Sequence, residues 1–304
     1  MHTAQVTQWG TPPQYLETVN LPANIGPGQA RIKVHGVGLH ALVRARASGT
    51  HYSSKSLPHV PGTDGVGTLE DGKLVYFSTF ATGGSYSDFV DVPTEAITPL
   101  PDGVDPIQVA AFMNPGLSSW MAMKTRCQPL PPSFSVLILG ATSASGSIAV
   151  SLARALGAST VIGCARNTTA MESLGLDKMI ELKTDPSLTD FSPANGVDIV
   201  LDYVYGPATE QFFKTVKVTK PLQYVHIGAL SGPEISLPGS VLRSKDLTIR
   251  GSGPGAFSHE AMHDEVPHLL RAFVGAKPLA VRVAALKDVA TTWNEKGDRT
   301  VFVP

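Results

Sequence analysis

The sequence predicts an α/β protein in two parts, a β-rich domain followed by a doubly wound parallel sheet. Its length of 304 residues allows about two hydrophobic cores. Up to about residue 115, short alternating or β-branched runs are separated by glycine and proline, which is typical of a β-rich domain with partly barrel-like sheets. Beyond that point strand-like and helix-like segments alternate, which predicts a parallel sheet with helical crossovers.

The predicted elements follow the chain in order. The β-rich runs are ARIKVHGVGL at 30–39, GVGTLED at 65–71, KLVYFS at 73–78 and GGSYSDFVDV at 83–92. In the second part we predict six strands, at 135–140, 160–164, 178–182, 197–202, 222–228 and 247–251. Helical patterns lie between most of them, notably SIAVSLARALG, TAMESLG and TEQFFKTVK.

The tail from Ala256 contains one amphipathic helix and ends in the apolar strand TVFVP, which could return to the N-terminal sheet. We therefore divide the chain into a β-rich domain at 1–115, an α/β domain at 116–254 and a C-terminal segment at 255–304 that returns to the first domain.

Composition narrows the class of protein. A hydrophobic fraction of 42% and a charged fraction of 16% are typical of a folded domain. The net charge is -1 with no basic stripe, which argues against nucleic acid and anionic membranes as partners. No apolar run approaches the roughly 20 residues of a membrane span. Only Cys127 and Cys164 occur, so we expect no disulfide framework and a cytoplasmic location.

The turn between the first strand and helix of the α/β domain has the composition of a phosphate-binding loop. Gly140 and Gly146 flank it, and its interior residues are all small: Ala141, Thr142, Ser143, Ala144 and Ser145. Small residues let backbone N–H groups reach a pyrophosphate, and the helix N-terminus adds its positive dipole end. Ser143 needs a backbone conformation that tolerates a Cβ, and its hydroxyl could donate to a phosphate. A tight structural turn is the alternative interpretation.

The end of the second strand indicates which dinucleotide would bind. An acidic residue there holds the ribose hydroxyls of NAD, whereas an arginine accommodates the 2′-phosphate of NADP. Arg166 and Asn167 stand at this point, and no carboxylate follows before Glu172. A guanidinium offers paired donors to a phosphate. The sequence therefore favours NADPH, with an ordinary surface arginine as the alternative.

Eight segments, in this order and spacing, resemble one family: IKVHGVGLHALVRARASGTHY, VPGTDGVG, GGSYSDFVDV, AFMNPGLSSWMAM, LGATSASGS, GVDIVLDYVYG, YVHIGALSG and LTIRGSGPG. The chain resembles the medium-chain dehydrogenase/reductase superfamily, on its zinc-independent quinone oxidoreductase and enoyl reductase side. The resemblance covers nearly the whole length. It implies a GroES-like catalytic domain, a Rossmann NADP-binding domain, a C-terminus that rejoins the first domain and, in many members, a homodimer.

The chain departs from the zinc alcohol dehydrogenases of this superfamily. Those enzymes place a cysteine in the stretch that corresponds to GLHA and a His–Glu pair where this chain has Thr63 and Asp64. Here His40 stands near the first position, and two cysteines are too few for a structural zinc lobe. His40 and Asp64 could contribute two ligands, but we expect no metal.

One motif suggests a different activity. HEAMH, from His259 to His263, matches the zincin pattern His-Glu-x-x-His. Its context is poor, because Pro267 follows within about one turn. The apolar residues Met262, Val266, Leu269 and Phe273 form a core-facing stripe that leaves the His-rich first turn mostly solvated. We expect no protease site.

Hydride transfer without zinc needs protein donors for the developing substrate oxyanion. The resemblance places the substrate near GLHA, GTHYSS and residues 114–119, which makes Tyr52 the first candidate donor and His40 the second. A structural role is the alternative for each. The resemblance also implies that Ser118 contacts the cofactor ribose, with a buried helix serine as the alternative. Further cofactor contacts are expected from Gly228 and Ser252, with Ala229 and Gly253 beside them. Asp202 and Tyr203 end a strand at the ligand-binding edge, where Asp202 could equally cap the next loop.

The sequence therefore predicts an NADPH-dependent, zinc-independent oxidoreductase that transfers hydride to a quinone or an activated C=C bond of a small molecule. Two other classes stay open. One is an NADPH-binding protein without turnover, and the other is a cyclase or isomerase that uses the same scaffold without redox chemistry.

Overall fold

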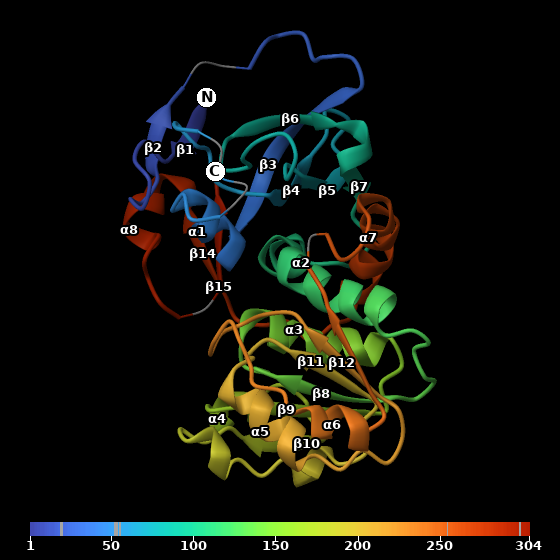
Figure 1. Cartoon of the computed structure of the whole chain (residues 1–304). Coiled ribbons are helices and arrows are strands. Elements are labelled where there is room, and N and C mark those ends of the chain that lie inside the picture. Colours follow the sequence, from blue (N-terminus) through green and yellow to red (C-terminus); the bar gives the residue numbers. More distant parts are fainter. Residues whose placement is uncertain (19–20, 52–53, 55, 254, 298) are drawn as a thin grey trace. The chain divides into compact units, whose positions relative to one another are not determined.

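The computed structural model describes residues 1–304 except 19–20, 52–53, 55, 254 and 298. The chain forms two compact units (Figure 1). Unit 1 consists of Met1–Asn114 and Val266–Pro304, and unit 2 consists of Pro115–Glu265. No helix of the described part is long and apolar enough to cross a bilayer.

Unit 1 is built on a mixed sheet with the strand order β14-β15-β3-β4-β5-β7, and β6 pairs with β3 beside this path. The sheet strands are β3 (Gln29–Leu39), β4 (Asp64–Thr68), β5 (Leu74–Ser78), β6 (Phe89–Pro93), β7 (Ile97–Pro99), β14 (Val281–Ala285) and β15 (Arg299–Val303). A separate antiparallel pair is formed by β1 (His2–Gln5) and β2 (Gln14–Glu17). The β-rich rhythm of the first third of the sequence is thus confirmed.

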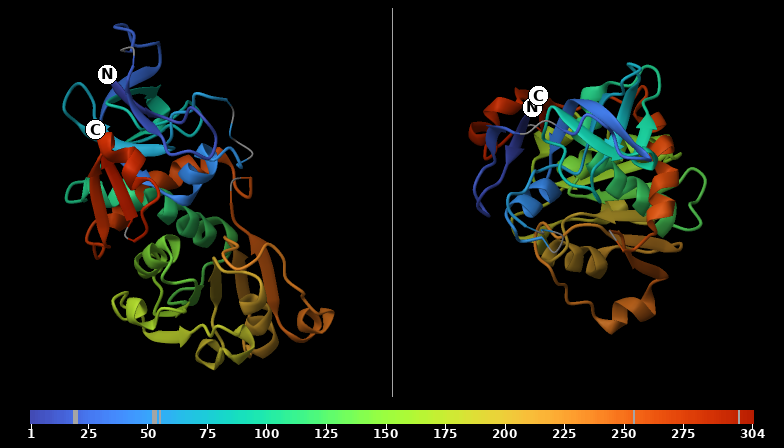
Figure 2. Two further views of the ribbon diagram at one scale, coloured as in Figure 1. Left: turned by 90° about the vertical axis from the view of Figure 1, so that its left-hand side faces the viewer. Right: turned by 90° about the horizontal axis from the view of Figure 1, so that it is seen from above.

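The C-terminal strand returns to this sheet, as predicted. β15 pairs antiparallel with β3, with Phe302 opposite Val37. Figure 2 shows the C-terminal tail, in red, beside the N-terminal part of the same unit, in blue. β14 and the short helix α8 (Val289–Thr292) lie in the same tail and were not predicted, because each is too short for a clear periodic pattern. Phe302 is fully buried, and it packs against Tyr86 with ring centroids 5.6 Å apart.

The other helices that reach unit 1 are α1 (Ala41–Ala47), the first part of α2 (Pro106–Met121) and most of α7 (His259–Phe273). α2 contains Pro115 and continues as a π turn at Ala122–Arg126. One glycine fixes how closely α2 packs, because a Cβ on Gly38 would lie 2.1 Å from the Ala110 carbonyl oxygen. The core of this unit is formed by buried apolar side chains from β3, β5, β6 and the tail.

Unit 2 is a six-stranded parallel sheet with the order β10-β9-β8-β11-β12-β13, which confirms the doubly wound prediction. Its strands are β8 (Ser135–Leu139), β9 (Thr160–Ala165), β10 (Lys178–Glu181), β11 (Ile199–Asp202), β12 (Leu222–His226) and β13 (Leu247–Gly251). The order runs outward in both directions from the boundary between β8 and β11. In such sheets ligands bind beyond the carboxyl ends of the strands at this boundary.

The crossover helices of unit 2 are α3 (Ala144–Ala155), α4 (Thr168–Glu172), α5 (Pro207–Thr215) and α6 (Gly239–Ser244). The 3-10 turns Pro186–Leu188 and Ser192–Ala194 replace a helix between β10 and β11. Crossovers that leave β8 and β11 in opposite directions put α3 and α5 on opposite faces of the sheet, as Figure 1 shows. Aromatic side chains from α5 and β12 fill the core beside them: Phe212, Phe213 and Tyr224.

Candidate cofactor and active site

Two glycines shape the turn that follows β8. Gly140 has φ +88°, a left-handed conformation that favours glycine. A Cβ on Gly146 would lie 2.2 Å from the Gly140 carbonyl oxygen, so only glycine fits where α3 passes the end of the strand. The turn is anchored to the neighbouring strand, because the N–H groups of Gly140 and Ala141 donate to the Cys164 carbonyl at 2.8 and 3.1 Å.

The backbone conformation of Ser143 explains why a residue with a Cβ fits at this position. Ser143 has φ -71° and ψ 160°, an extended conformation that tolerates a Cβ. It is the N-cap of α3, and its Oγ accepts a hydrogen bond from the Gly146 N–H at 3.0 Å. An accepting hydroxyl still has its own proton to donate. A glycine is therefore not required at this position.

The first turn of α3 fits the phosphates of a dinucleotide. Within the described part of the chain, the N–H groups of Ala144 and Ser145 donate to no acceptor. These donors and the positive end of the helix dipole attract anions. Thr142 and Ala141 complete a turn of small side chains that leaves the backbone approachable.

The carboxyl end of β9 lies beside this turn, because β9 pairs with β8. Arg166 follows the strand directly and its side chain is exposed. Asn167 is the N-cap of α4, and its side-chain oxygen accepts from the Ala170 N–H at 3.0 Å. Arg166 therefore has a guanidinium available to a phosphate, whereas the side-chain oxygen of Asn167 already serves its helix.

Asp202 has a structural role. Its buried carboxylate accepts four hydrogen bonds, from Val204 N at 2.7 Å, Tyr205 N at 2.9 Å, Thr209 Oγ1 at 2.5 Å and Tyr224 OH at 2.5 Å. Two bonds per oxygen satisfy a buried carboxylate. Of the two roles that the sequence left open, the structure places Asp202 in the one that caps the loop after β11.

Ser118 and its neighbour Ser119 make different contacts. Ser118 Oγ donates to the Pro115 carbonyl at 2.6 Å within α2. Ser119 is fully buried, and its Oγ lies 2.5 Å from the hydroxyl of Tyr203. Burial raises the pKa of Tyr203 despite its hydrogen bonds to the two serines, so this hydroxyl stays protonated at neutral pH. The Ser119–Tyr203 pair was not singled out from the sequence, which contains no signal for such a long-range contact.

The ends of β12 and β13 present two polar atoms without partners. His226 pairs in register with Gly251, and Ser252 follows directly. His226 Nε2 and Ser252 Oγ are both shielded from solvent and have no hydrogen-bond partner within the described ranges of the chain. Gly228 lies beside them, and a Cβ there would approach the Tyr203 carbonyl oxygen to 3.1 Å. Buried polar atoms without partners are rare, so they indicate a polar ligand at this edge. His226 was missed because one histidine in a strand carries no distinctive pattern.

In unit 1, His40 belongs to a buried polar network. His40 Nε2 lies 3.2 Å from Thr63 Oγ1 and 3.5 Å from Asp64 Oδ1. Thr63 donates its proton to Asp64 Oδ1 at 2.9 Å, and Tyr76 OH donates to Asp64 Oδ2 at 3.3 Å. Thr63 can therefore accept from a protonated Nε2. His40 Nδ1 is buried and has no partner among the residues that the structure describes, so it is the ring atom left for another molecule. Tyr52, the first candidate donor, lies outside the described residues.

The surroundings of His40 make a poor zinc site. Zinc prefers cysteine, histidine and carboxylate ligands in a tetrahedral arrangement. Here one imidazole and one carboxylate are accompanied by hydroxyl groups, and both carboxylate oxygens already accept hydrogen bonds. Among the described residues, no three side chains of histidine, cysteine, aspartate or glutamate gather as ligands.

The HEAMH motif lies on α7, which runs through Pro267 to Phe273. Three residues of the predicted core-facing stripe are buried, Val266, Leu269 and Phe273, whereas Met262 is only partly buried. His263 is exposed, and its Nδ1 lies 3.7 Å from Asp264.

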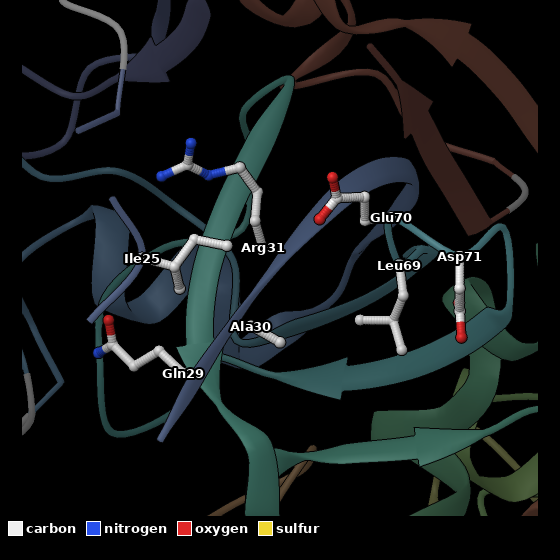
Figure 3. Close-up of a pocket in the computed structure, with 7 residues that line it drawn as sticks. All are labelled: Ile25, Gln29, Ala30, Arg31, Leu69, Glu70 and Asp71. Atoms are coloured by element: carbon white, nitrogen blue, oxygen red, sulfur yellow. The ribbon is translucent and has the colours of Figure 1, made fainter. Parts of the chain in front are cut away.

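A surface pocket of about 490 Å³ lies in unit 1, at the start of β3 and the turn between β4 and β5 (Figure 3). Arg31 is its cationic side chain, and that guanidinium is already paired with Asp91 through two hydrogen bonds of 2.7 Å. None of the predicted site residues lines this pocket.

Comparison with known proteins shows similarity along the whole chain, although no protein-family model matches it. A "Probable NADPH-dependent quinone reductase" of Emericella nidulans is 34% identical, with all of both chains covered. A "Quinone oxidoreductase-like protein 2 homolog" of Nematostella vectensis is 24% identical over 82% of this chain and 70% of its own. An "Acrylyl-CoA reductase" of Ruegeria pomeroyi is 30% identical over 41% of this chain and 43% of its own.

Solved structures show the same fold. A mycobacterial quinone oxidoreductase superposes with a TM-score of 0.82 at 21% identity, covering all of both chains. A Pseudomonas syringae quinone oxidoreductase gives a TM-score of 0.77 at 24% identity, covering 100% of this chain and 99% of its own. With the full-length relative at 34% identity, the chain belongs to the quinone oxidoreductase family of medium-chain dehydrogenases/reductases.

Proposed function

We propose that the chain is an NADPH-dependent quinone reductase that works by hydride transfer and without zinc. The observation that carries the proposal is the turn at 140–146, whose glycines and free amides fit a pyrophosphate. The full-length relative named as a probable NADPH-dependent quinone reductase supports the cofactor and the acceptor.

In this proposal different residues bind the pyrophosphate and the 2′-phosphate of the cofactor. Ser143 and the amides of Ala144 and Ser145 bind the pyrophosphate, and Gly140 and Gly146 permit its approach. Arg166, with Asn167 beside it, binds the 2′-phosphate. When bound, NADPH would supply a hydride to an electron-poor carbon of the acceptor.

The partnerless polar atoms at the ends of β12 and β13 suit the nicotinamide end. His226 Nε2 and Ser252 Oγ are available to an amide group. Gly228 keeps the backbone close to Tyr203, which leaves space on the ligand side. Ser118 is proposed to contact the ribose, for which its hydroxyl would have to turn from the Pro115 carbonyl.

His40 is the described residue best suited to the acceptor oxygen. Hydride addition to a quinone leaves charge on that oxygen, and a positioned donor stabilises it. Because Nε2 faces Thr63 and Asp64, Nδ1 is the atom that would donate. Donation from Nδ1 requires that this ring nitrogen carries a proton. Tyr52, the first candidate from the sequence, remains a proposed donor in addition to His40.

An assay of NADPH oxidation over a panel of quinones and enones, with a chelator in the buffer, tests this function. We expect quinones to be reduced and NADH to be a poor donor. The acrylyl-CoA reductase among the relatives favours activated C=C bonds as a second acceptor class. NADPH binding without oxidation by any acceptor would instead support a binding protein or a non-redox enzyme.

A further inference from the structure

Unit 1 contains a buried arginine that has no anionic partner among the described residues. Arg46 of α1 is 6% exposed, and its Nε and Nη1 atoms are shielded from solvent and have no hydrogen-bond partner in the described part of the chain. No carboxylate of the described residues lies within 4.0 Å of it. The contrast is Arg31, which is paired with Asp91. Burying a cation without a counter-charge is strongly unfavourable, so an anion bound beside Arg46 would stabilise its charge.

The surroundings of Arg46 combine an aromatic ring with further unsatisfied polar atoms. The guanidinium carbon lies 5.5 Å from the centre of the Phe80 ring. The buried hydroxyl of Thr79, the preceding residue, has no hydrogen-bond partner among the described residues, and neither has the buried Nε2 of His59. Burial and the charge of Arg46 both lower the pKa of His59, which keeps that ring neutral and able to donate or accept.

These groups are connected to the proposed proton donor. The Thr79 N–H donates to the Thr63 carbonyl at 2.8 Å, and the hydroxyl of Thr63 lies 3.2 Å from His40 Nε2. His40 is also the N-cap residue of α1, which carries Arg46 about 9 Å further along its axis. The unpaired cation and the free His40 Nδ1 thus belong to one connected part of unit 1.

We propose that Arg46 binds the acidic group of an anionic aromatic substrate, such as a quinone that carries a sulfonate, a carboxylate or an ionised hydroxyl. This inference rests on the proposed function and names its substrate class. A guanidinium that is 6% exposed is reached by a small molecule and not by the surface of a macromolecule. The Phe80 ring offers the apolar contact for the carbon skeleton that bears the charge.

Calorimetric titration of the full chain, without NADPH, tests the proposal. The probes are naphthalene-2-sulfonate and the neutral naphthalene-2-sulfonamide, which differ in charge but hardly in shape. We expect the sulfonate to bind at least about tenfold tighter than the sulfonamide, because hydrogen bonds to charged groups are stronger than those to neutral groups. Arg46→Met should abolish this preference, and Arg271→Met, which removes an exposed arginine of the same unit, should keep it. Arg46→Gln gives the same comparison if the Met variant does not fold.

Three results would overturn the inference. Equal binding of the two probes by the unmodified chain would show that no anion site exists. An unchanged preference in the Arg46 variants would place the site elsewhere. Inorganic phosphate binding as tightly as the sulfonate would show a site for free anions and not for an aromatic acid. Failure of the proposed function is distinguishable, because it appears as no NADPH oxidation with either 1,4-naphthoquinone or its 2-sulfonate while the calorimetry still reports binding.

Discussion

Replacing Ser143 by aspartate should separate the two roles that we give this residue. Aspartate is as favourable as serine at the N-cap position, and its negative charge is stabilised by the positive end of the helix dipole. The free energy of unfolding should therefore stay the same or rise by about 0.5 kcal/mol. A carboxylate about 4 Å from a phosphate charge costs about 4 kcal/mol at an effective dielectric constant near 20. Salt and rotation of the side chain reduce this, so we expect NADPH affinity to fall by about 2–3 kcal/mol, roughly 30- to 150-fold.

Ser143→Asn is the matched control, because asparagine caps as well and carries no charge. It should bind NADPH within a few-fold of the unmodified chain. Calorimetric titration gives the two affinities, and thermal melting gives the two stabilities. If the Asp and Asn variants bound NADPH equally well, the phosphates would not lie at the N-terminus of α3, and the assignment of residues 140–146 would be wrong.

Three further variants test other parts of the account. Arg166→Ala should weaken NADPH by about 1.5–3 kcal/mol and leave NADH almost unchanged, and equal losses in titrations of both nucleotides would refute the 2′-phosphate role. His40→Ala should lower quinone turnover about 10²- to 10³-fold at unchanged NADPH affinity; if Tyr52→Phe alone has this effect, Tyr52 is the donor. Burial raises the pKa of Asp198, but hydrogen bonds from Lys220 and Ser135 lower it overall below 3.8. Its contribution is therefore fully present above about pH 3.8 and is lost as the pH falls through the lower pKa of the folded state, so Asp198→Asn should cost about 1.5–3 kcal/mol at pH 7 and progressively less as the pH is lowered below 3.8 in denaturant titrations.

The sequence predicts most of unit 2 because its signals are local. The strands and crossover helices repeat with a clear period, and the turn at 140–146 is short enough to interpret residue by residue. The N-cap role of Ser143 could also have been expected, since serine before a helix is a common cap. The tail was harder, because β14 gains its stability from pairing with β15, which no local pattern indicates.

The candidate sites were less predictable because they depend on long-range contacts. Asp202 could be read as a ligand or a cap until its four donors, reaching as far as Tyr224 in β12, were seen together. Arg46 looks in the sequence like one of several arginines on a helix face. Only the folded chain shows that it is buried and that no carboxylate accompanies it.

The most direct test of the central claim is an anaerobic reaction of the full chain with NADPH and a quinone, in which consumption of NADPH and formation of hydroquinone are followed together. We predict that the two change one for one and that NADH does not substitute at the same concentration. NADPH that binds but is not consumed, or hydroquinone that forms without loss of NADPH, would contradict the claim that this chain is an NADPH-dependent quinone reductase.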